Sequence, residues 1–425
     1  MTSNLAMDAA VDVLGRLPDN GLGRSRKAAL RALQDTGLPG TQNEDWKYTD
    51  LSEAIEISND WLRAGGKTAP VDAQSIAAVT AGLEVDWLII RNGEVDLEAL
   101  AALQRPGLST TLLSDSEAPR ETSNGLASMN LALLRDGIVI RIDPDTDLDR
   151  PIGILCIDNA AIARAASQAR IVISIGAGGS ASFVEYHVSD GDSEHFANSI
   201  VELNLEKDAN VDYLRIQERH ALHSQTGYLR AKLDAGSRLQ HGAFDFGGKL
   251  VRNDLHIEIN GPDAEAHFCG LYLAQDGQHI DNHTRVDHKV GPARSAQEYR
   301  GILHGKARCV WNGKAIVHAG ADGTDADQAN HNLLLTERCE VDTKPELEIY
   351  ADDVKCSHGT TVGQLDETAL FYLRTRGIEE GAARQLLTRA FAETIALQAP
   401  IEQLQQRISE GIARKLAGMS SGDAA

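Results

Sequence analysis

A short unit of strand, tight turn and strand repeats four times in the middle of the chain. Its copies read IVISIGAGGSASF, IVELNLEKDANVD, YLRAKLDAGSRLQ and LHIEINGPDAEAH. The turn pairs Gly179-Ser180, Asp208-Ala209, Gly236-Ser237 and Asp263-Ala264 recur at intervals of 29, 28 and 27 residues, a spacing typical of repeat architectures. One such strand pair cannot bury its apolar face alone, whereas stacked coils share a continuous interior. The repeat predicts a β-solenoid, and the alternative is an antiparallel sandwich, whose short strands are also evenly spaced.

Three regions follow from the pattern along the chain. Apolar stripes at helical spacing, separated by Pro and Gly, predict a helical region over residues 1–80. We expect the β-helix core over residues 81–345, with the clear repeat from about residue 150. Helical stripes return after it, so residues 346–425 are expected to form a C-terminal helical domain that includes a Cys-Ser-His-Gly motif. At 425 residues the chain exceeds a single core of about 250 to 300 residues, which agrees with this division.

Charge and composition exclude several classes of partner. The 62 acidic and 41 basic residues give a net charge of −21, which repels phosphate backbones and anionic lipid surfaces, so we expect neither nucleic acid nor a membrane as partner. The opening MTSNLAMDAAVDVLGRL lacks a basic stretch followed by an apolar core, and a cytoplasmic location is expected. Five widely spaced cysteines, an odd number, argue against a disulfide framework.

Motifs for autonomous catalysis are absent from the sequence. It contains no GxxxxGK[ST] phosphate loop, no GxGxxG dinucleotide turn and no HExxH metal-binding motif. We therefore expect a protein that is not an enzyme by itself, and any ATP hydrolysis must come from a partner.

The sharpest candidate site is Cys356-Ser357-His358. In an extended segment alternate side chains share a face, so the thiol and the imidazole would point together. Both groups bind iron, but a cluster normally takes four ligands, and a site with two would need another chain to complete it. The alternative is a small buried cysteine beside a hydrogen-bonded turn histidine.

Three further groups are weaker candidates. His279, His283 and His288 could bind a metal if the strands stack suitably, but hydrogen-bonded surface is favoured because His288 has the opposite strand parity. Asp352 and Asp353 could be a catalytic acid pair, although adjacent strand residues face opposite sides and solvated loop charge is favoured. The segment Trp46-Lys47-Tyr48 could form a contact surface, and an aromatic anchor for the helical region is favoured.

Two long motifs resemble a known family. The segment KPELEIYADDVKCSHGTTVGQLDETALFYLRTRGI (residues 344–378) closely resembles the C-terminal signature of the SufB/SufD family, and NLLLTERCEVDTKPELEI extends the match upstream. NEDWKYTDL (residues 43–51) is similar to a tryptophan-containing motif of the SufD branch. The chain lacks the clustered N-terminal cysteines of many SufB proteins and has CSHG instead of a more acidic version, so SufD is favoured.

The resemblance implies a mainly β fold, a right-handed parallel β-helix flanked by N-terminal and C-terminal helical regions. It also implies a subunit of the SufB–SufC–SufD iron–sulfur cluster assembly scaffold, which forms a heterodimer with SufB and docks the SufC ATPase through the C-terminal helical domain. It places His358, and less strongly Cys356, at the site where a nascent cluster forms. The cluster would be transient, with none stably bound by the isolated chain, which could homodimerise when alone.

Two alternatives remain open from the sequence. A β-helical carbohydrate-active enzyme would need a groove with several convergent carboxylates on stacked strands. A purely structural brace for SufB, with no iron contact, would retain function without Cys356 and His358.

Overall fold

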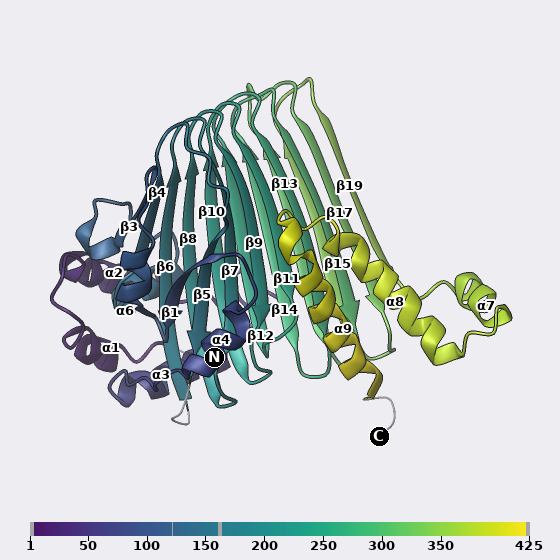
Figure 1. Cartoon of the computed structure of the whole chain (residues 1–425), viewed down its shortest axis with the longest axis horizontal. Helices are drawn as coiled ribbons and strands as arrows, with labels where there is room; N and C mark the ends of the chain where they lie inside the picture. Colours follow the sequence, from purple (N-terminus) through teal and green to yellow (C-terminus); the bar gives the residue numbers. More distant parts are fainter. Residues whose placement is uncertain (1–3, 121, 160–163, 422–425) are drawn as a thin grey trace.

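Stacked parallel strands form the body of the molecule, with helices at both ends of the chain (Figure 1). The computed structural model describes residues 4–120, 122–159 and 164–421. Ten strands form one sheet, here called sheet A, in the order β19-β17-β15-β13-β11-β9-β7-β5-β1-β2. Nine strands form sheet B, in the order β18-β16-β14-β12-β10-β8-β6-β4-β3. The chain therefore alternates between two sheets, as a parallel β-helix does, and the solenoid prediction is confirmed.

The strand bounds follow this alternation. Sheet A contains β1 (Asp86–Arg91), β2 (Glu94–Val95), β5 (Ile152–Asp158), β7 (Ser180–Ser189), β9 (Asn210–Glu218), β11 (Arg238–Asp245), β13 (Glu265–Ala274), β15 (Arg294–Leu303), β17 (Asp325–Leu334) and β19 (Lys355–Gly363). Sheet B contains β3 (Leu108–Leu112), β4 (Ile138–Ile142), β6 (Arg164–Ile175), β8 (Glu194–Leu205), β10 (His223–Leu233), β12 (Leu250–Ile259), β14 (His279–His288), β16 (Arg308–Val317) and β18 (Glu340–Ile349). Only the β1/β2 and β3/β4 pairs among these are antiparallel.

The repeated turns lie directly above one another at one corner of the coil. The N–H of Asp208 donates to Ala235 O at 2.9 Å, and the N–H of Gly236 donates to Pro262 O at 2.9 Å. Gly178, Asp208, Gly236 and Asp263 have positive φ angles of 69°, 58°, 68° and 59°. Glycine adopts this left-handed conformation freely and aspartate tolerates it better than most residues. The alternation of Gly and Asp in the sequence repeat is thus the signature of one stacked turn geometry, although the equivalent residue of the first copy is Gly178 and not the aligned Gly179.

Helices of the N-terminal region cover the outer face of sheet B over its first coils. They are α1 (Met7–Leu14), α2 (Gly23–Thr36), α3 (Ser52–Arg63) and α6 (Gly125–Leu133), and they share one apolar cluster with strands β6 and β8. Four more helical segments in this half are α4 (Ala73–Thr80), α5 (Leu97–Ala102) and the 3-10 turns η1 (Glu44–Trp46) and η2 (Leu113–Asp115). The helices close the first end of the solenoid, where β1 and β3 begin the two sheets (Figure 1).

The C-terminal helices lie against the outer face of sheet A, except the first of them. Helix α8 (Glu380–Ala396) and helix α9 (Gln405–Ser421), joined by the 3-10 turn η3 (Glu402–Leu404), pack an apolar face on strands β7 to β15. Helix α7 (Glu367–Thr375) extends away from the solenoid (Figure 1). Over the described part of the chain, no helix is both long and apolar enough to cross a membrane.

The β-helix extends further than the expected boundary at residue 345. Strand β18 runs on to Ile349 and β19 to Gly363, so the helices begin only at Glu367 and the CSHG motif lies on the last strand. Pro345 sits inside β18, which is the edge strand of sheet B. Proline is tolerated on edge strands because the ladder there is incomplete, so it marks an edge here and does not end the strand.

The interior of the coils from β5 to β11 is ionic near one corner. Arg219 pairs with Asp158 at 2.7 Å, and Arg215 pairs with Asp245 at 2.8 Å, with all four side chains buried. Burial lowers the pKa of His195 to about 4 and the pKa values of His223 and His241 to about 3. These histidines are therefore neutral in the folded protein at physiological pH.

This interior predicts loss of stability in mild acid. In the unfolded chain histidines titrate near pH 6.5, so below that value the unfolded state binds more protons than the folded state. The free energy of unfolding should be constant above about pH 7 and should fall between about pH 6.5 and 4, by up to about 1.4 kcal/mol per pH unit for each such histidine. Urea denaturation at pH 7.5, 5.5 and 4.5 measures it. The His241→Gln variant should show a shallower pH slope than the wild type, and equal stability at all three pH values would contradict the prediction.

Candidate functional site

The motif Cys356-Ser357-His358 lies on the outermost strand of sheet A. Strand β19 pairs only with β17, and Cys356 lies level with Ala326 while His358 lies level with Gln328. Ala326 and Gln328 are buried on the inward face of β17. Cys356 and His358 therefore share the inward face of the last strand, as their spacing predicts.

This inward face is open because no further coil covers it. Cys356 is half-buried and His358 is exposed, whereas the residues level with them one strand earlier are buried. Burial raises the pKa of the Cys356 thiol. Since a metal binds the thiolate, the isolated strand does not favour the form of Cys356 that would bind iron.

A row of buried amides lies on the inward face of β17, where Asn330 and Asn332 lie level with Thr360 and Val362 of β19, just past the motif. Asn330 donates to Tyr272 Oη at 3.0 Å, Asn332 donates to Asn330 Oδ1 at 2.6 Å, and Thr343 of β18 donates to Asn330 Oδ1 at 2.8 Å. The bond from Thr343 joins sheet A to sheet B, between β17 and the last strand of sheet B. The row forms a hydrogen-bonded layer on the strand that precedes β19. The alternation of Gln328, Asn330 and Asn332 along the sequence is a signal that could have revealed this layer.

Among the residues that the structure describes, no three His, Cys, Asp or Glu side chains are grouped so that they could hold a metal ion. Cys356 and His358 form at most half of a cluster's usual ligand set. The remaining ligands of any cluster at this position would have to come from outside the described chain.

The three histidines of β14 do not form a site. His279 Nε2 lies 2.8 Å from Thr49 Oγ1, and His283 pairs with Asp281 at 3.1 Å, both on the outer face. His288 is fully buried inside the coil, with Nε2 2.9 Å from Ser295 Oγ. His279 and His283 thus lie on the outer face of β14 and His288 on its inner face, as the strand parity predicts.

Trp46 anchors the N-terminal segment on sheet B. The Arg252 guanidinium lies 4.4 Å from the centroid of its ring, and Arg252 also pairs with Asp254 at 2.7 Å. Asp352 and Asp353, the other candidate pair, are exposed in the turn before β19. These positions match the favoured interpretations, an anchor and solvated loop charge.

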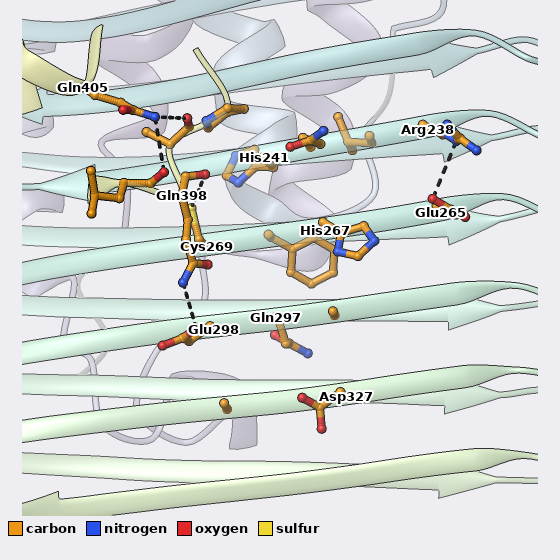
Figure 2. Close-up of a pocket in the computed structure, with 18 of the residues that line it drawn as sticks. Arg238, His241, Glu265, His267, Cys269, Gln297, Glu298, Asp327, Gln398 and Gln405 are labelled. Carbon is orange, nitrogen blue, oxygen red and sulfur yellow. Dashed lines mark hydrogen bonds and ion pairs between the residues drawn. The ribbon is translucent and has the colours of Figure 1, made fainter. Parts of the chain in front are cut away.

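A groove of about 730 Å³ lies on the outer face of sheet A beside the turn between α8 and α9 (Figure 2). Its carboxylates are Glu265, Glu298, Asp327 and Glu402. Burial acts to raise the pKa of Glu298, but hydrogen bonds from Gln398 and Arg300 outweigh it and lower the pKa below its ordinary value. A glycosidase needs one carboxyl with a raised pKa as general acid, and Glu298 is not such a group.

These features define a parallel β-helix protein whose candidate ligands sit at an open pair of sheet edges. The family model for the SUF system FeS cluster assembly SufBD core domain matches residues 157–391. The chain belongs to this SufBD family.

Curated relatives match over nearly the whole chain. The iron–sulfur cluster assembly protein SufD of Escherichia coli is 28% identical over 393 residues, which cover 92% of each chain. A SufBD family protein of Synechocystis is 29% identical over 417 residues, covering 92% of this chain and 90% of the relative. The chloroplastic protein ABCI7 of Arabidopsis thaliana is 24% identical over 413 residues, covering 93% and 87%.

We expect the exposed His358 to be dispensable for folding and the buried Asn330 of β17 to be needed for full stability. His358→Ala should change the free energy of unfolding by less than about 0.5 kcal/mol, as is usual for exposed positions. Asn330→Ala should cost about 1 to 3 kcal/mol because it leaves buried partners unsatisfied. Urea denaturation of the two variants beside the wild type compares them directly, and a large loss in His358→Ala would show that the imidazole supports the fold.

Proposed function

We propose that the chain is the SufD-like subunit of a SufB–SufC–SufD scaffold, on which iron–sulfur clusters are assembled in the cytoplasm. The observation that carries the proposal is the full-length similarity to a SufD protein, combined with a half ligand set at an open end. The subunit is not itself an enzyme, and the iron–sulfur cluster is its cargo.

The heterodimer with a SufB-like subunit forms at the open end. Strands β18 and β19 each have one edge without a neighbouring strand, and such edges readily pair with another chain. Ile349, Tyr350 and Val362 are exposed apolar residues in the same region, which adds apolar area to the backbone pairing. A homodimer of the isolated chain would use the same edges.

The SufC ATPase docks on the C-terminal helices. Helix α7 extends from the body and exposes Phe371 and Tyr372, whose exposed fractions are 68% and 56%. Aromatic side chains of this kind are common anchors of protein interfaces. Helices α8 and α9 fasten this region to sheet A, so motion of the ATPase would be transmitted to the solenoid.

His358 supplies a ligand to the nascent cluster, with Cys356 beside it in a supporting role. Both side chains face the open end, where the partner subunit would contribute the other ligands. A histidine ligand also raises the potential of a cluster relative to cysteine, which suits a cluster that is later released. The alternative is a brace that never contacts iron.

The cluster role is tested by anaerobic reconstitution of the three-subunit complex. His358→Ala should lower the cluster yield, measured by absorbance and by iron and sulfide content, at least 10-fold, while assembly and ATP hydrolysis stay normal. Cys356→Ala should have a smaller effect. An undiminished cluster yield in the His358→Ala complex would leave the subunit as a brace.

ATPase docking is best tested with point variants of α7. Deleting everything after Gly377 would remove α8 and α9 and expose buried residues of sheet A such as Phe244, so loss of binding would be ambiguous. The double variant Phe371→Ser/Tyr372→Ser should weaken SufC binding by about 30-fold or more, because interface anchors contribute about 2 kcal/mol or more each. Leu97→Ser is the matched control, since Leu97 is 60% exposed on α5. Calorimetric titration with SufC measures both, and equal affinities would reject this docking surface.

A further inference from the structure

The open end of the solenoid has a surplus of negative charge. Residues 340–363, which form β18, the last turn and β19, contain six acidic residues and two lysines, so their net charge is −4. The acidic residues are Glu340, Asp342, Glu346, Glu348, Asp352 and Asp353, and the basic ones are Lys344 and Lys355.

On the outer face of sheet B, basic side chains of β16 already compensate one flank of β18. Lys314 pairs with Glu348 at 2.5 Å, and Arg308 pairs with Asp342 at 3.1 Å. These pairs join β18 to the strand on its inner side. Beyond β18, on the side of the open edge, the described chain places no strand.

Residues that lie level on neighbouring strands carry opposite charges at several positions of this surface, with exceptions on sheet B where Arg285 lies level with Lys314 and Glu258 with Asp287. On sheet A the residues Glu265, Arg294, Asp325 and Lys355 lie level on β13, β15, β17 and β19. On sheet B the same alternation runs from basic β16 to acidic β18. A strand added next to β18 would continue the pattern if its outward side chains were basic.

A second copy of this chain is a poor match for the same edge. End-to-end association would bring together two ends that each have a net charge of −4. If β18 paired antiparallel with its own copy about Lys344, Glu340 would face Glu348 and Asp342 would face Glu346. Like charges directly opposite each other destabilise a strand pair.

We propose that this acidic end selects against a second copy and for a partner whose edge strand carries lysine or arginine on its outward face opposite β18. The inference rests on the proposed function, because the SufB-like subunit of the same cell is the occupant it names. Charge complementarity then sets which dimer forms at an edge whose backbone hydrogen bonds would accept any strand.

Salt should act in opposite directions on the two dimers. Raising NaCl from 50 to 500 mM screens attraction in the heterodimer and repulsion in the homodimer. The dissociation constant of the SufB-like subunit, measured by calorimetry, should rise about 10-fold or more, and self-association of the isolated chain, measured by sedimentation equilibrium, should strengthen. Salt effects of the same sign on both, or none, would overturn the inference.

A second experiment removes negative charge from the outer face of β18. Glu346→Gln/Glu348→Gln should weaken the heterodimer about 10-fold at 50 mM NaCl and should strengthen self-association. Glu402→Gln/Glu410→Gln, which removes the same charge from η3 and α9, should change neither. If the SufB-like subunit does not bind at any salt concentration, the proposed function is wrong. The self-association measurements then still decide whether this end repels a second copy. If the subunit binds but the edge variants leave its affinity unchanged, only the proposed charge selection is wrong.

Discussion

Backbone hydrogen bonding between successive coils is the interaction on which the rest of this structure depends. Each strand of the solenoid satisfies its N–H and C=O groups on the strands one coil before and one coil after, and the corner turns do the same through bonds such as Asp208 N–H to Ala235 O. This hydrogen-bonding pattern does not by itself limit the number of coils. The helices at its first end cover the start of the stack, and its last coil leaves two strands with an open edge.

The function that we propose depends on the end of the stack where β18 and β19 each have an edge without a neighbouring strand. The interior is closed along most of its length, with an apolar cluster that extends from β1 to β14 and buried ion pairs near one corner, and it becomes accessible at β19, where Cys356 and His358 lie on the uncovered inward face of the last coil. The amide row of Asn330 and Asn332 holds the two sheets together just behind that opening. For the function that we propose, a second subunit would complete the ligand set, and a site shared in this way needs its own side chains to be held in position by the fold.

Much of this was predictable from the sequence, because the decisive signals are local. The Gly and Asp turn positions recur with the coil, and alternation along a strand places Cys356 and His358 on one face. The end of the β-helix was harder to predict, since Pro345 resembles a terminator until β18 is known to be an edge strand. Partners such as Arg252 for Trp46 depend on the register of distant coils, and no local pattern encodes that register.

The segment around Trp46 also has a consequence for how the chain folds. It lies along the outer face of sheet B, with Lys249 bonded to Glu53, Thr49 bonded to His279, and Glu44 within 3.5 Å of Lys344 on the final strand of that sheet. Contacts between residues 300 positions apart can form only after the last coil has been synthesised, and such long-range contacts slow folding. During synthesis the N-terminal motif emerges first and must wait for the coils that carry Arg252 and His279, so the nascent chain would expose this aromatic segment to chaperones until more than half of the protein has been made.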